Sequence, residues 1–312
     1  MKTRRIVAIV GPTASGKTRL SLLVAEMLSG EIVSADSRQI FKYLDIGTAK
    51  PTQAERRRVP HHFVDVLDPK DEYSAGLFGD DVKIVLRDIF ERGKVPILVG
   101  GSGLYVKAAI DGLFGGPGRD PEIRARLEDQ LRTEGLRPLL ETLEKVDPIV
   151  LQRMKEITPR RVVRALEVFF IAGKPLSEYH SEQEKIPDYQ AVQFGLEWER
   201  KELYSRINQR VDRMISDGLE DEAQRLAGMG YDRHLNALNT VGYKEVFDFL
   251  EGTVNRETMI ELIKRNTRRF AKRQITWFKA DKRIRRVPMT EALDLTTAAR
   301  RMVDGYRKER AK

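Results

Sequence analysis

The chain has 312 residues, of which 41% are hydrophobic and 33% are charged, which allows one large domain or two smaller ones. It has no cysteine, which excludes disulfides, thiolate catalysis and zinc–cysteine sites, and no apolar run long enough for a membrane-spanning helix. Because the first expected strand begins at residue 6, we expect no signal peptide and a cytoplasmic protein.

The positive charge is concentrated in one segment. The formal net charge is +9, and residues 264–287 hold eleven Lys and Arg against a single acid, Asp281. This segment alone therefore exceeds the net charge of the whole chain. Such a cluster is typical of a surface that binds a polyanion, most often nucleic acid.

The first motif is a phosphate-binding loop between an apolar strand expected over 6–10 and a helix expected over 19–28. Residues 11–18 match the pattern G-x-x-x-x-G-K-[ST] without a mismatch. In such a loop, backbone N–H groups surround an anion, the lysine reaches the outer phosphates and the hydroxyl can bind magnesium. The predicted polyphosphate site is therefore Gly11, Pro12, Thr13, Ala14, Ser15, Gly16, Lys17 and Thr18, with Thr18 on the metal.

Further short apolar runs predict strands over 31–35, 62–66, 95–99 and 192–196. Helical stretches separate them, which favours an α/β fold with a parallel, P-loop NTPase-like sheet flanked by helices. Because ligands bind at the carboxyl ends of parallel strands, we expect the loop, Asp36 and the Gly-rich turn at 100–103 to lie close together.

A long interruption separates the last two of these strands. It opens with glycines and a proline at 115–118, and Asp120 is placed to cap a helix that runs to about 133. A second helix is predicted over 159–172, with apolar positions Val162, Val163, Leu166, Phe169 and Phe170. We interpret 117–189 as a helical insertion domain, with 1–116 and 190–312 forming the catalytic core.

After residue 196 the chain looks helical. Leu203, Ile207 and Val211 form an apolar stripe, and Ile260, Ile263, Phe270 and Trp277 mark the inward face of a later basic helix. Trp277 and Phe278 are interpreted as anchors of that helix in the core.

These patterns leave several activities open. A phosphate loop is most common in kinases and NTPases, and Asp36 could activate an acceptor hydroxyl, bind magnesium or cap a helix. A non-enzymatic RNA-binding module would explain the basic segment but not an intact loop. Adjacent residues on a strand point to opposite faces, so His61 and His62 are not expected to share a metal.

Seven long segments identify the chain as similar to bacterial tRNA dimethylallyltransferases, also called tRNA isopentenyltransferases. They cover 11–18, 34–51 (SADSRQIFKYLDIGTAKP), 60–69, 95–108, 158–177, 239–245 and 267–279 (TRRFAKRQITWFK). Eukaryotic members of this family carry an added zinc finger, which a chain without cysteine cannot form. The resemblance is therefore to the bacterial form.

The resemblance implies transfer of a dimethylallyl group from dimethylallyl diphosphate to the exocyclic amine of the adenosine on the 3′ side of the anticodon. The phosphate loop would hold the donor's diphosphate with Mg²⁺, and Lys17 and Arg210 would neutralise the leaving group. Asp36 would be the general base and Ser102 would bond the base or the amine. An adenylate dimethylallyltransferase would use the same donor and is a further alternative, beside a small-molecule kinase.

The resemblance also implies which residues contact the anticodon stem-loop of tRNA. They are Asp36, Ser37, Arg38, Gln39, Ser102, Arg124, Arg160, Arg161, Val162, Val163, Arg164, Asn239, Lys244, Lys272, Arg273, Gln274 and Lys279. The target base must leave the stack to react. We expect a monomer.

Overall fold

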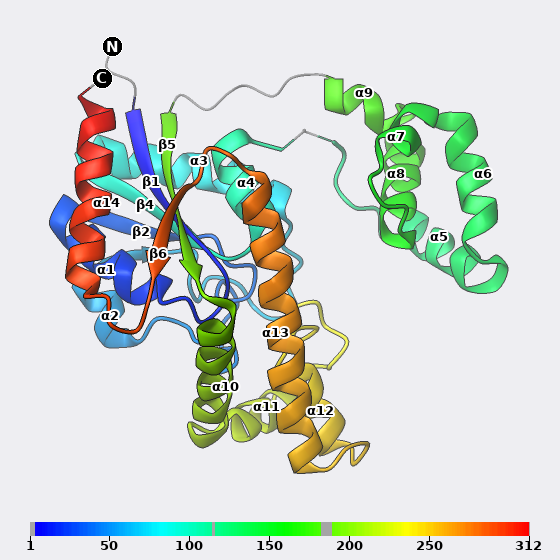
Figure 1. Ribbon diagram of the computed structural model, residues 1–312. Helices are drawn as coiled ribbons and strands as arrows, with labels where there is room; N and C mark the ends of the chain where they lie inside the picture. The colour runs from blue at the N-terminus through cyan, green and yellow to red at the C-terminus, as the bar shows by residue number, and fades with distance from the viewer. Residues whose placement is uncertain (1–3, 114–115, 182–188, 312) are drawn as a thin grey trace. The chain divides into compact units, whose positions relative to one another are not determined.

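The computed structural model describes residues 4–113, 116–181 and 189–311 (Figure 1). The chain forms two compact units: a core unit of Met1–Asp111 with Pro187–Lys312, and an insertion unit of Gly112–Ile186. The insertion unit starts and ends a few residues earlier than the insertion predicted from the sequence, 117–189. Among the described residues, no helix is both long enough and apolar enough to cross a membrane.

The core unit is built on a six-stranded sheet in which every paired strand is parallel. The strands, in the spatial order β3-β2-β4-β1-β5-β6, are β3 (His61–His62), β2 (Gly30–Ser34), β4 (Val95–Gly100), β1 (Arg4–Val10), β5 (Tyr189–Trp198) and β6 (Arg285–Met289). The predicted parallel α/β sheet is thus confirmed. The expectation that only helices follow residue 196 is wrong, because β6 forms within the basic segment and pairs with β5.

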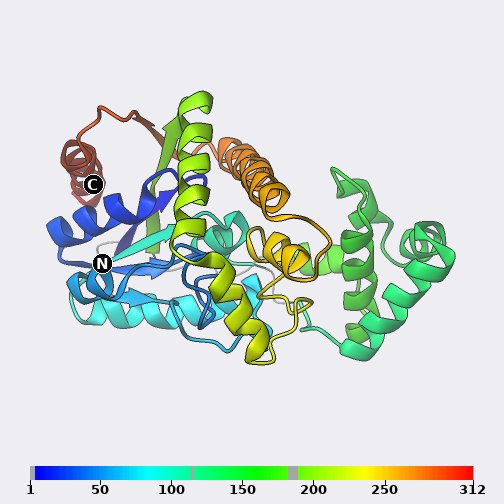
Figure 2. The same cartoon turned by 90° about the horizontal axis from the view of Figure 1, so that it is seen from below.

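Helices cover both faces of this sheet (Figures 1 and 2). On one face, α1 (Lys17–Leu28) and α14 (Leu295–Arg310) pack together over a core that includes Val7 and Ile9 of β1. The alternate residues of β1 are equally buried, which explains why the strand is apolar throughout. The remaining helices around the sheet are α2 (Gln53–Arg58), α3 (Ala75–Glu91) and α4 (Gly103–Asp111).

Four more helices extend from the carboxyl end of the sheet: α10 (Arg200–Ser216), α11 (Leu219–Gly228), α12 (Tyr243–Leu250) and α13 (Arg256–Ala280) (Figure 1). Helices α10 and α13 pack against each other through the predicted stripe residues Leu203 and Ile207, which meet Ala271. This packing brings the basic helix α13 to the end of the sheet where the phosphate loop lies.

The buried face of α13 differs from the predicted one. The buried residues are Met259, Ile263, Ala271, Gln274 and Phe278, whereas Trp277 is 47% exposed and Phe270 is 38% exposed. Trp277 nevertheless lies against Gly103, where a side-chain carbon would approach its ring to 2.3 Å. Phe278 is a core anchor as predicted; Trp277 is a half-exposed ring packed on a glycine.

Helices are the only regular secondary structure of the insertion unit in the part that the structure describes. Its helices are α5 (Pro121–Glu134), α6 (Leu136–Val146), α7 (Pro148–Arg153), α8 (Pro159–Ala172) and α9 (Leu176–Ser181). Asp120 caps α5 as predicted, accepting the N–H groups of Glu122 and Ile123. Val162 and Val163 lie inside the unit's own core. Phe170, expected there too, is 39% exposed.

Candidate functional site

The phosphate loop runs from β1 into α1 and is held from outside by two side chains of neighbouring elements. Trp198 at the end of β5 donates its indole N–H to the carbonyl of Ser15 at 3.0 Å. Arg206 of α10 donates to the carbonyl of Ala14 at 3.0 Å and stacks on the Trp198 ring. Ala14 has a φ of +61° and Gly16 a φ of +89°, the strained turn that directs successive N–H groups inward. These contacts fix the loop in an anion-binding shape.

Two cations converge beside this loop. The Lys17 ammonium donates to the carbonyls of Gly11 at 3.0 Å and Pro12 at 2.6 Å. Burial, with repulsion from Arg210, lowers the pKa of Lys17 to about 7 although Asp36 opposes the shift. Burial also lowers the pKa of Arg210, again against the attraction of Asp36. Two half-buried positive groups held close together form a site that favours a multiply charged anion.

The hydroxyl of Ser15 strengthens that assignment. Ser15 is fully buried in the loop, and its hydroxyl oxygen has no hydrogen-bond partner among the residues the structure describes. An unsatisfied buried hydroxyl is costly, and a phosphate oxygen within the loop is a partner that removes this cost.

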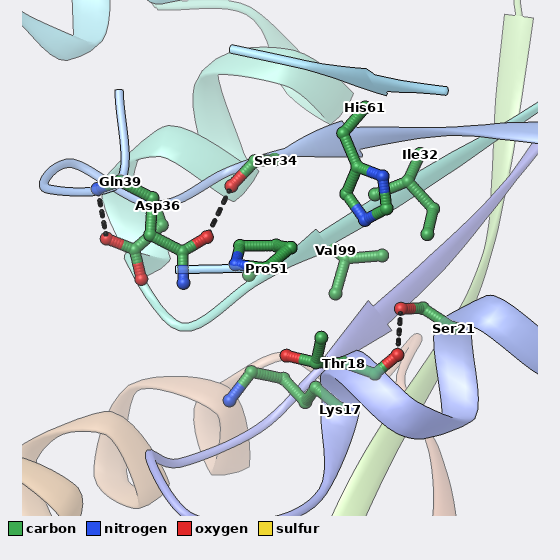
Figure 3. A pocket seen from close by; sticks show the side chains of 11 residues that line it. Lys17, Thr18, Ser21, Ile32, Ser34, Asp36, Gln39, Pro51, His61 and Val99 are labelled. Atoms are coloured by element: carbon green, nitrogen blue, oxygen red, sulfur yellow. Dashed lines mark hydrogen bonds between the residues drawn. The ribbon is translucent and has the colours of Figure 1, made fainter. Parts of the chain in front are cut away.

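Asp36 lies directly after β2, across a cavity from Lys17 and Thr18 (Figure 3). One carboxylate oxygen, Oδ1, accepts the backbone N–H groups of Arg38 at 2.9 Å and Gln39 at 3.4 Å. Residues 37–40 form turns and no helix begins there, so Asp36 holds a turn and does not cap a helix, which was the alternative that the sequence left open. The turn uses Oδ1 and leaves Oδ2 for the cavity.

The cavity has a polar end and an apolar end. Figure 3 shows Ser34, Asp36 and Gln39 grouped at one end, with Ile32 and His61 at the other. Its full lining is Lys17, Thr18, Ser21, Ile32, Ser34, Asp36, Gln39, Pro51, His61, Val99 and Gly100. His61 bonds the carbonyl of Val59, and burial lowers the pKa of its imidazole. His62 instead pairs with Glu31, so the two histidines act separately, as predicted.

Ser102 follows β4 and bonds to Ser37, the neighbour of Asp36. Its hydroxyl accepts the N–H of Ser37 at 3.1 Å and donates to the Ser37 hydroxyl at 3.3 Å. The sequence-based expectation gave Ser102 a bond to the base or to the amine. The observed bonds instead tie the turn after β4 to the turn that carries Asp36.

The residues present fit a magnesium ion bound mainly through a ligand. Thr18 and Asp36 line the same cavity and offer only oxygen donors, which Mg²⁺ prefers. Among the described residues, no group of three or more His, Cys, Asp or Glu could hold a metal. Magnesium commonly uses one or two protein oxygens, with phosphate oxygens and water completing its octahedron. Thr18 is the residue that would hold it.

Three residues predicted to contact tRNA have buried side chains. Gln274 is 7% exposed, and its amide donates to the carbonyl of Gly101 at 2.9 Å while its oxygen accepts the N–H of Thr13 at 2.8 Å. Gln274 therefore supports the phosphate loop. The side chains of Val162 and Val163 are core residues of the insertion unit and offer no surface to RNA.

Two arginines predicted to contact tRNA are engaged in the insertion unit. Arg124 and Arg164 both contact the carboxylate of Glu167, at 3.4 and 2.7 Å, and Glu167 is fully buried. Arg164 also donates to the carbonyls of Pro117 and Gly118. Their first role is to neutralise a buried acid.

Other predicted RNA contacts lie on exposed surface: Arg160, Arg161, Asn239, Lys244, Lys272, Arg273 and Lys279. Asn239 and Lys244 line a second cavity of the core unit with Arg233, His234 and Glu251. Ser37, Arg38 and Gln39 are partly buried beside Asp36, and Arg38 donates to the carbonyl of Asn236 at 2.5 Å.

The sequence analysis missed Trp198 and Arg206, which fix the phosphate loop from outside. The sequence did hold a signal for Trp198, because this residue lies at the carboxyl end of strand β5, and the phosphate loop lies at the same end of the sheet. Arg206 lies off the apolar stripe of its helix, a position that by itself does not distinguish a solvated arginine from one that bonds a carbonyl.

Comparisons with known proteins place this chain in a family. The IPP transferase family model matches residues 39–281, and the isopentenyl transferase model matches residues 4–68. A tRNA dimethylallyltransferase of Pelotomaculum thermopropionicum is 45% identical over 91% of this chain and 90% of its own. One of Thermotoga neapolitana is 48% identical over 88% of this chain and 89% of its own.

Solved structures show the same similarity. The full-length tRNA isopentenylpyrophosphate transferase of Bacillus halodurans superposes with a TM-score of 0.74 at 39% identity, covering 99% of this chain and 97% of that one. A eukaryotic dimethylallyltransferase acting on tRNA gives a TM-score of 0.80 at 27% identity, covering 98% of this chain and 80% of the other. This chain therefore belongs to the IPP transferase family, whose members named here are tRNA dimethylallyltransferases.

Proposed function

We propose that the protein transfers a dimethylallyl group from dimethylallyl diphosphate to the exocyclic amine of the adenosine on the 3′ side of the anticodon in tRNA, releasing diphosphate. The observation that carries this proposal is the grouping of two half-buried cations, Lys17 and Arg210, with the Asp36 carboxylate, which lines one cavity together with Lys17. An anion site and a candidate base at one place suit a transfer whose leaving group is diphosphate.

The diphosphate binds in the loop at 11–18. Lys17 turns from its carbonyl partners, Gly11 and Pro12, to the outer phosphate, and Arg210 adds a second positive charge. The two positive charges repel each other until an anion binds between them. They therefore stabilise the negative charge that develops on the bridging oxygen as the carbon–oxygen bond of the donor breaks. Magnesium on Thr18 would add Lewis-acid stabilisation of the same oxygens when bound.

The dimethylallyl group suits the apolar end of the cavity. Ile32, Val99 and Pro51 line it, with the neutral imidazole of His61 beside them. A nucleoside kinase would place a polar base or sugar in the corresponding space. An apolar wall beside an intact phosphate loop therefore supports a prenyl diphosphate donor.

Asp36 acts as general base in the transfer. The amine nitrogen forms a bond to the first carbon of the dimethylallyl group while the carbon–oxygen bond to diphosphate breaks, and the bonding pair leaves with diphosphate. The amine proton passes to the Asp36 carboxylate. Because Oδ1 is held by Arg38 and Gln39, Oδ2 is the atom placed to receive it.

The tRNA binds along the exposed basic face of α13. Lys272, Arg273 and Lys279 are exposed there, near the site through Gln274 of the same helix. Several other cations of the segment are already paired, Lys264 with Asp212, Arg283 with Asp111 and Arg285 with Glu309. Fewer cations are therefore available to RNA than the segment's composition indicates.

The deciding experiment uses labelled dimethylallyl diphosphate with magnesium and two acceptors, unmodified bacterial tRNA and AMP, with a buffer blank as the control. We expect label in tRNA, mapped to the base after the anticodon. Label in AMP alone would support dimethylallyl diphosphate as the donor but show that the acceptor is a free nucleotide and not tRNA. Label in neither, with phosphate transfer from ATP to a nucleoside, would make the protein a kinase. We further propose that it acts as a monomer in the cytoplasm, which light scattering and fractionation would check.

A further inference from the structure

Glu222 is a buried acid that stands outside the catalytic cavity. It lies on α11, is 2% exposed, and its two carboxylate oxygens accept four hydrogen bonds. Oε2 accepts the backbone N–H groups of Asp45 at 3.1 Å and Ile46 at 2.8 Å, and Oε1 accepts that of Gly47 at 3.1 Å. Tyr243 of α12 donates its hydroxyl to Oε1 at 2.5 Å.

The carboxylate thus binds three successive N–H groups of one loop, residues 45–50. Bonds to an ionised acceptor are about twice as strong as neutral ones, and a fully satisfied carboxylate offsets the cost of burial. The Tyr243 ring closes the same contact, because a side-chain carbon on Gly47 would approach it to 2.5 Å. Glycine at 47 lets the loop and the ring meet. Glu222 and Tyr243 together fix the path of the loop.

The far side of this loop faces the catalytic groups. The carbonyl of Thr48 accepts a hydrogen bond from Arg210 at 3.4 Å and one from the Gln39 amide at 3.3 Å. The Ala49 carbonyl accepts from the same amide at 3.2 Å. Gln39 in turn donates its backbone N–H to Oδ1 of Asp36 at 3.4 Å. Thr48, Ala49 and Gln39 thus lie between the loop residues that Glu222 binds and the candidate base Asp36.

We propose that Glu222 is a positioning residue, which acts through the loop at 45–50 to place the Arg210 guanidinium and the turn that carries Asp36. The inference rests on the proposed function in taking Arg210 as a ligand of diphosphate. Glu222 touches neither substrate. Its effect on the reaction passes through the Thr48 carbonyl, which orients a cation that would otherwise be free to rotate in its pocket.

The test is a double-mutant cycle on pyrophosphate binding, measured by calorimetry with the full chain and magnesium. Glu222→Gln keeps the size of the side chain but places an amide N–H against N–H donors. We expect the Kd for pyrophosphate to rise about tenfold, the size of effect that a lost charge-assisted contact gives. In an Arg210→Ala background the same change should alter the Kd less than about threefold, because the two residues act on one contact.

Two further variants keep the test decisive. Asp221→Asn removes a neighbouring exposed charge from the same helix and should leave the Kd unchanged. If Glu222→Gln does not fold, Tyr243→Phe removes one donor to Glu222 and retains the ring; it should raise the Kd about twofold, again only when Arg210 is present. Full additivity with Arg210→Ala, or an unchanged Kd in a folded variant, would overturn the inference. A wild-type chain that does not bind pyrophosphate would instead remove the diphosphate site, and this inference with it.

Discussion

The side-chain oxygen of Gln274 accepts a hydrogen bond from the backbone N–H of Thr13 at 2.8 Å, linking the basic helix α13 to the phosphate loop. The other end of the same amide donates to the carbonyl of Gly101, at the carboxyl end of β4. The helix proposed to bind RNA is therefore hydrogen-bonded directly to the loop proposed to bind the donor. A displacement of α13 would therefore be transmitted to the phosphate loop by Gln274.

We predict different roles for Gln274 and Lys272, which lie two positions apart on α13. Gln274→Met should weaken pyrophosphate binding and leave tRNA affinity nearly unchanged, because it leaves the Thr13 N–H and the Gly101 carbonyl buried without partners. Each such group costs about 1–3 kcal/mol. Lys272→Met, on the exposed face, should show the reverse pattern. Titrations with pyrophosphate and with an anticodon stem-loop check both, and a fall in RNA affinity alone for Gln274→Met would return this residue to the RNA surface.

The low pKa of Lys17 predicts a pH dependence of donor binding. With its pKa at about 7 in the free site, Lys17 is mostly neutral at pH 8, whereas diphosphate binding needs the ammonium. Binding above pH 7 then takes up a proton, and the Kd should rise by up to about tenfold per pH unit. The last ionisation of the donor's terminal phosphate, at about pH 6, is nearly complete in this range and does not interfere.

Lys17→Arg is the control, because its guanidinium stays charged and should flatten the profile between pH 7 and 9. The same shift has a consequence for stability. Between the folded pKa and the higher unfolded one, the unfolded chain binds more protons, so the free energy of unfolding of the ligand-free protein should increase with pH above 7. A pH-independent Kd in the wild type would show that Lys17 remains charged there.

Asp36→Asn should reduce kcat by about 10²–10⁴-fold, the usual contribution of a general base. The fold should persist, because an asparagine oxygen can still accept the N–H groups of Arg38 and Gln39 that Oδ1 accepts now. Affinity for tRNA and for pyrophosphate should change little. Asp80→Asn, on the exposed side of α3, is the matched loss of charge. Single-turnover rates measure the effect, and near-normal turnover would exclude Asp36 as the base.

Much of this arrangement follows from the sequence because its signals are local. A complete phosphate-loop motif, apolar runs with helical spacers and the Asp120 cap each depend on neighbouring residues, and the structure bears out the parallel sheet and the capped helix. What escaped depends on contacts between distant segments. Strand β6 contains charged residues and forms because it pairs with the free side of β5. Gln274 is buried because its amide bonds both Thr13 of the phosphate loop and Gly101 after β4. On α13, alternative apolar stripes fit the helical period, and packing selected the one with Phe278 rather than Trp277.

The exposed face of α13 predicts a salt dependence of tRNA binding. Neutralising Lys272 and Arg273 together should lower the affinity and reduce the slope of log K against log salt by about 1.4 to 1.8, because each phosphate contact contributes about 0.7 to 0.9. Arg307→Ala with Lys308→Ala removes the same charge from the exposed side of α14 and should leave the slope unchanged. Equal slopes for both pairs would place the RNA surface elsewhere.

Because Glu167 is buried, we expect Arg124 and Arg164 to contribute to the stability of the insertion unit, whether or not they also bind RNA. Oε2 of Glu167 accepts Arg164 at 2.7 Å and Arg124 at 3.4 Å, while Oε1 has no partner among the described residues. Arg124→Ala leaves this acid less compensated and should cost about 2–4 kcal/mol, near the range for breaking a buried pair.

Restoring the balance separates the two roles. In Arg124→Ala with Glu167→Leu, the acid and one partner are both removed, so much of the lost stability should return. If Arg124 only compensates Glu167, tRNA affinity should return with stability. If Arg124 also contacts RNA, the double variant should fold but bind tRNA weakly. Thermal unfolding and stem-loop titration of the three variants distinguish these results, and an Arg124→Ala protein as stable as the wild type would show that Arg164 alone neutralises the buried acid.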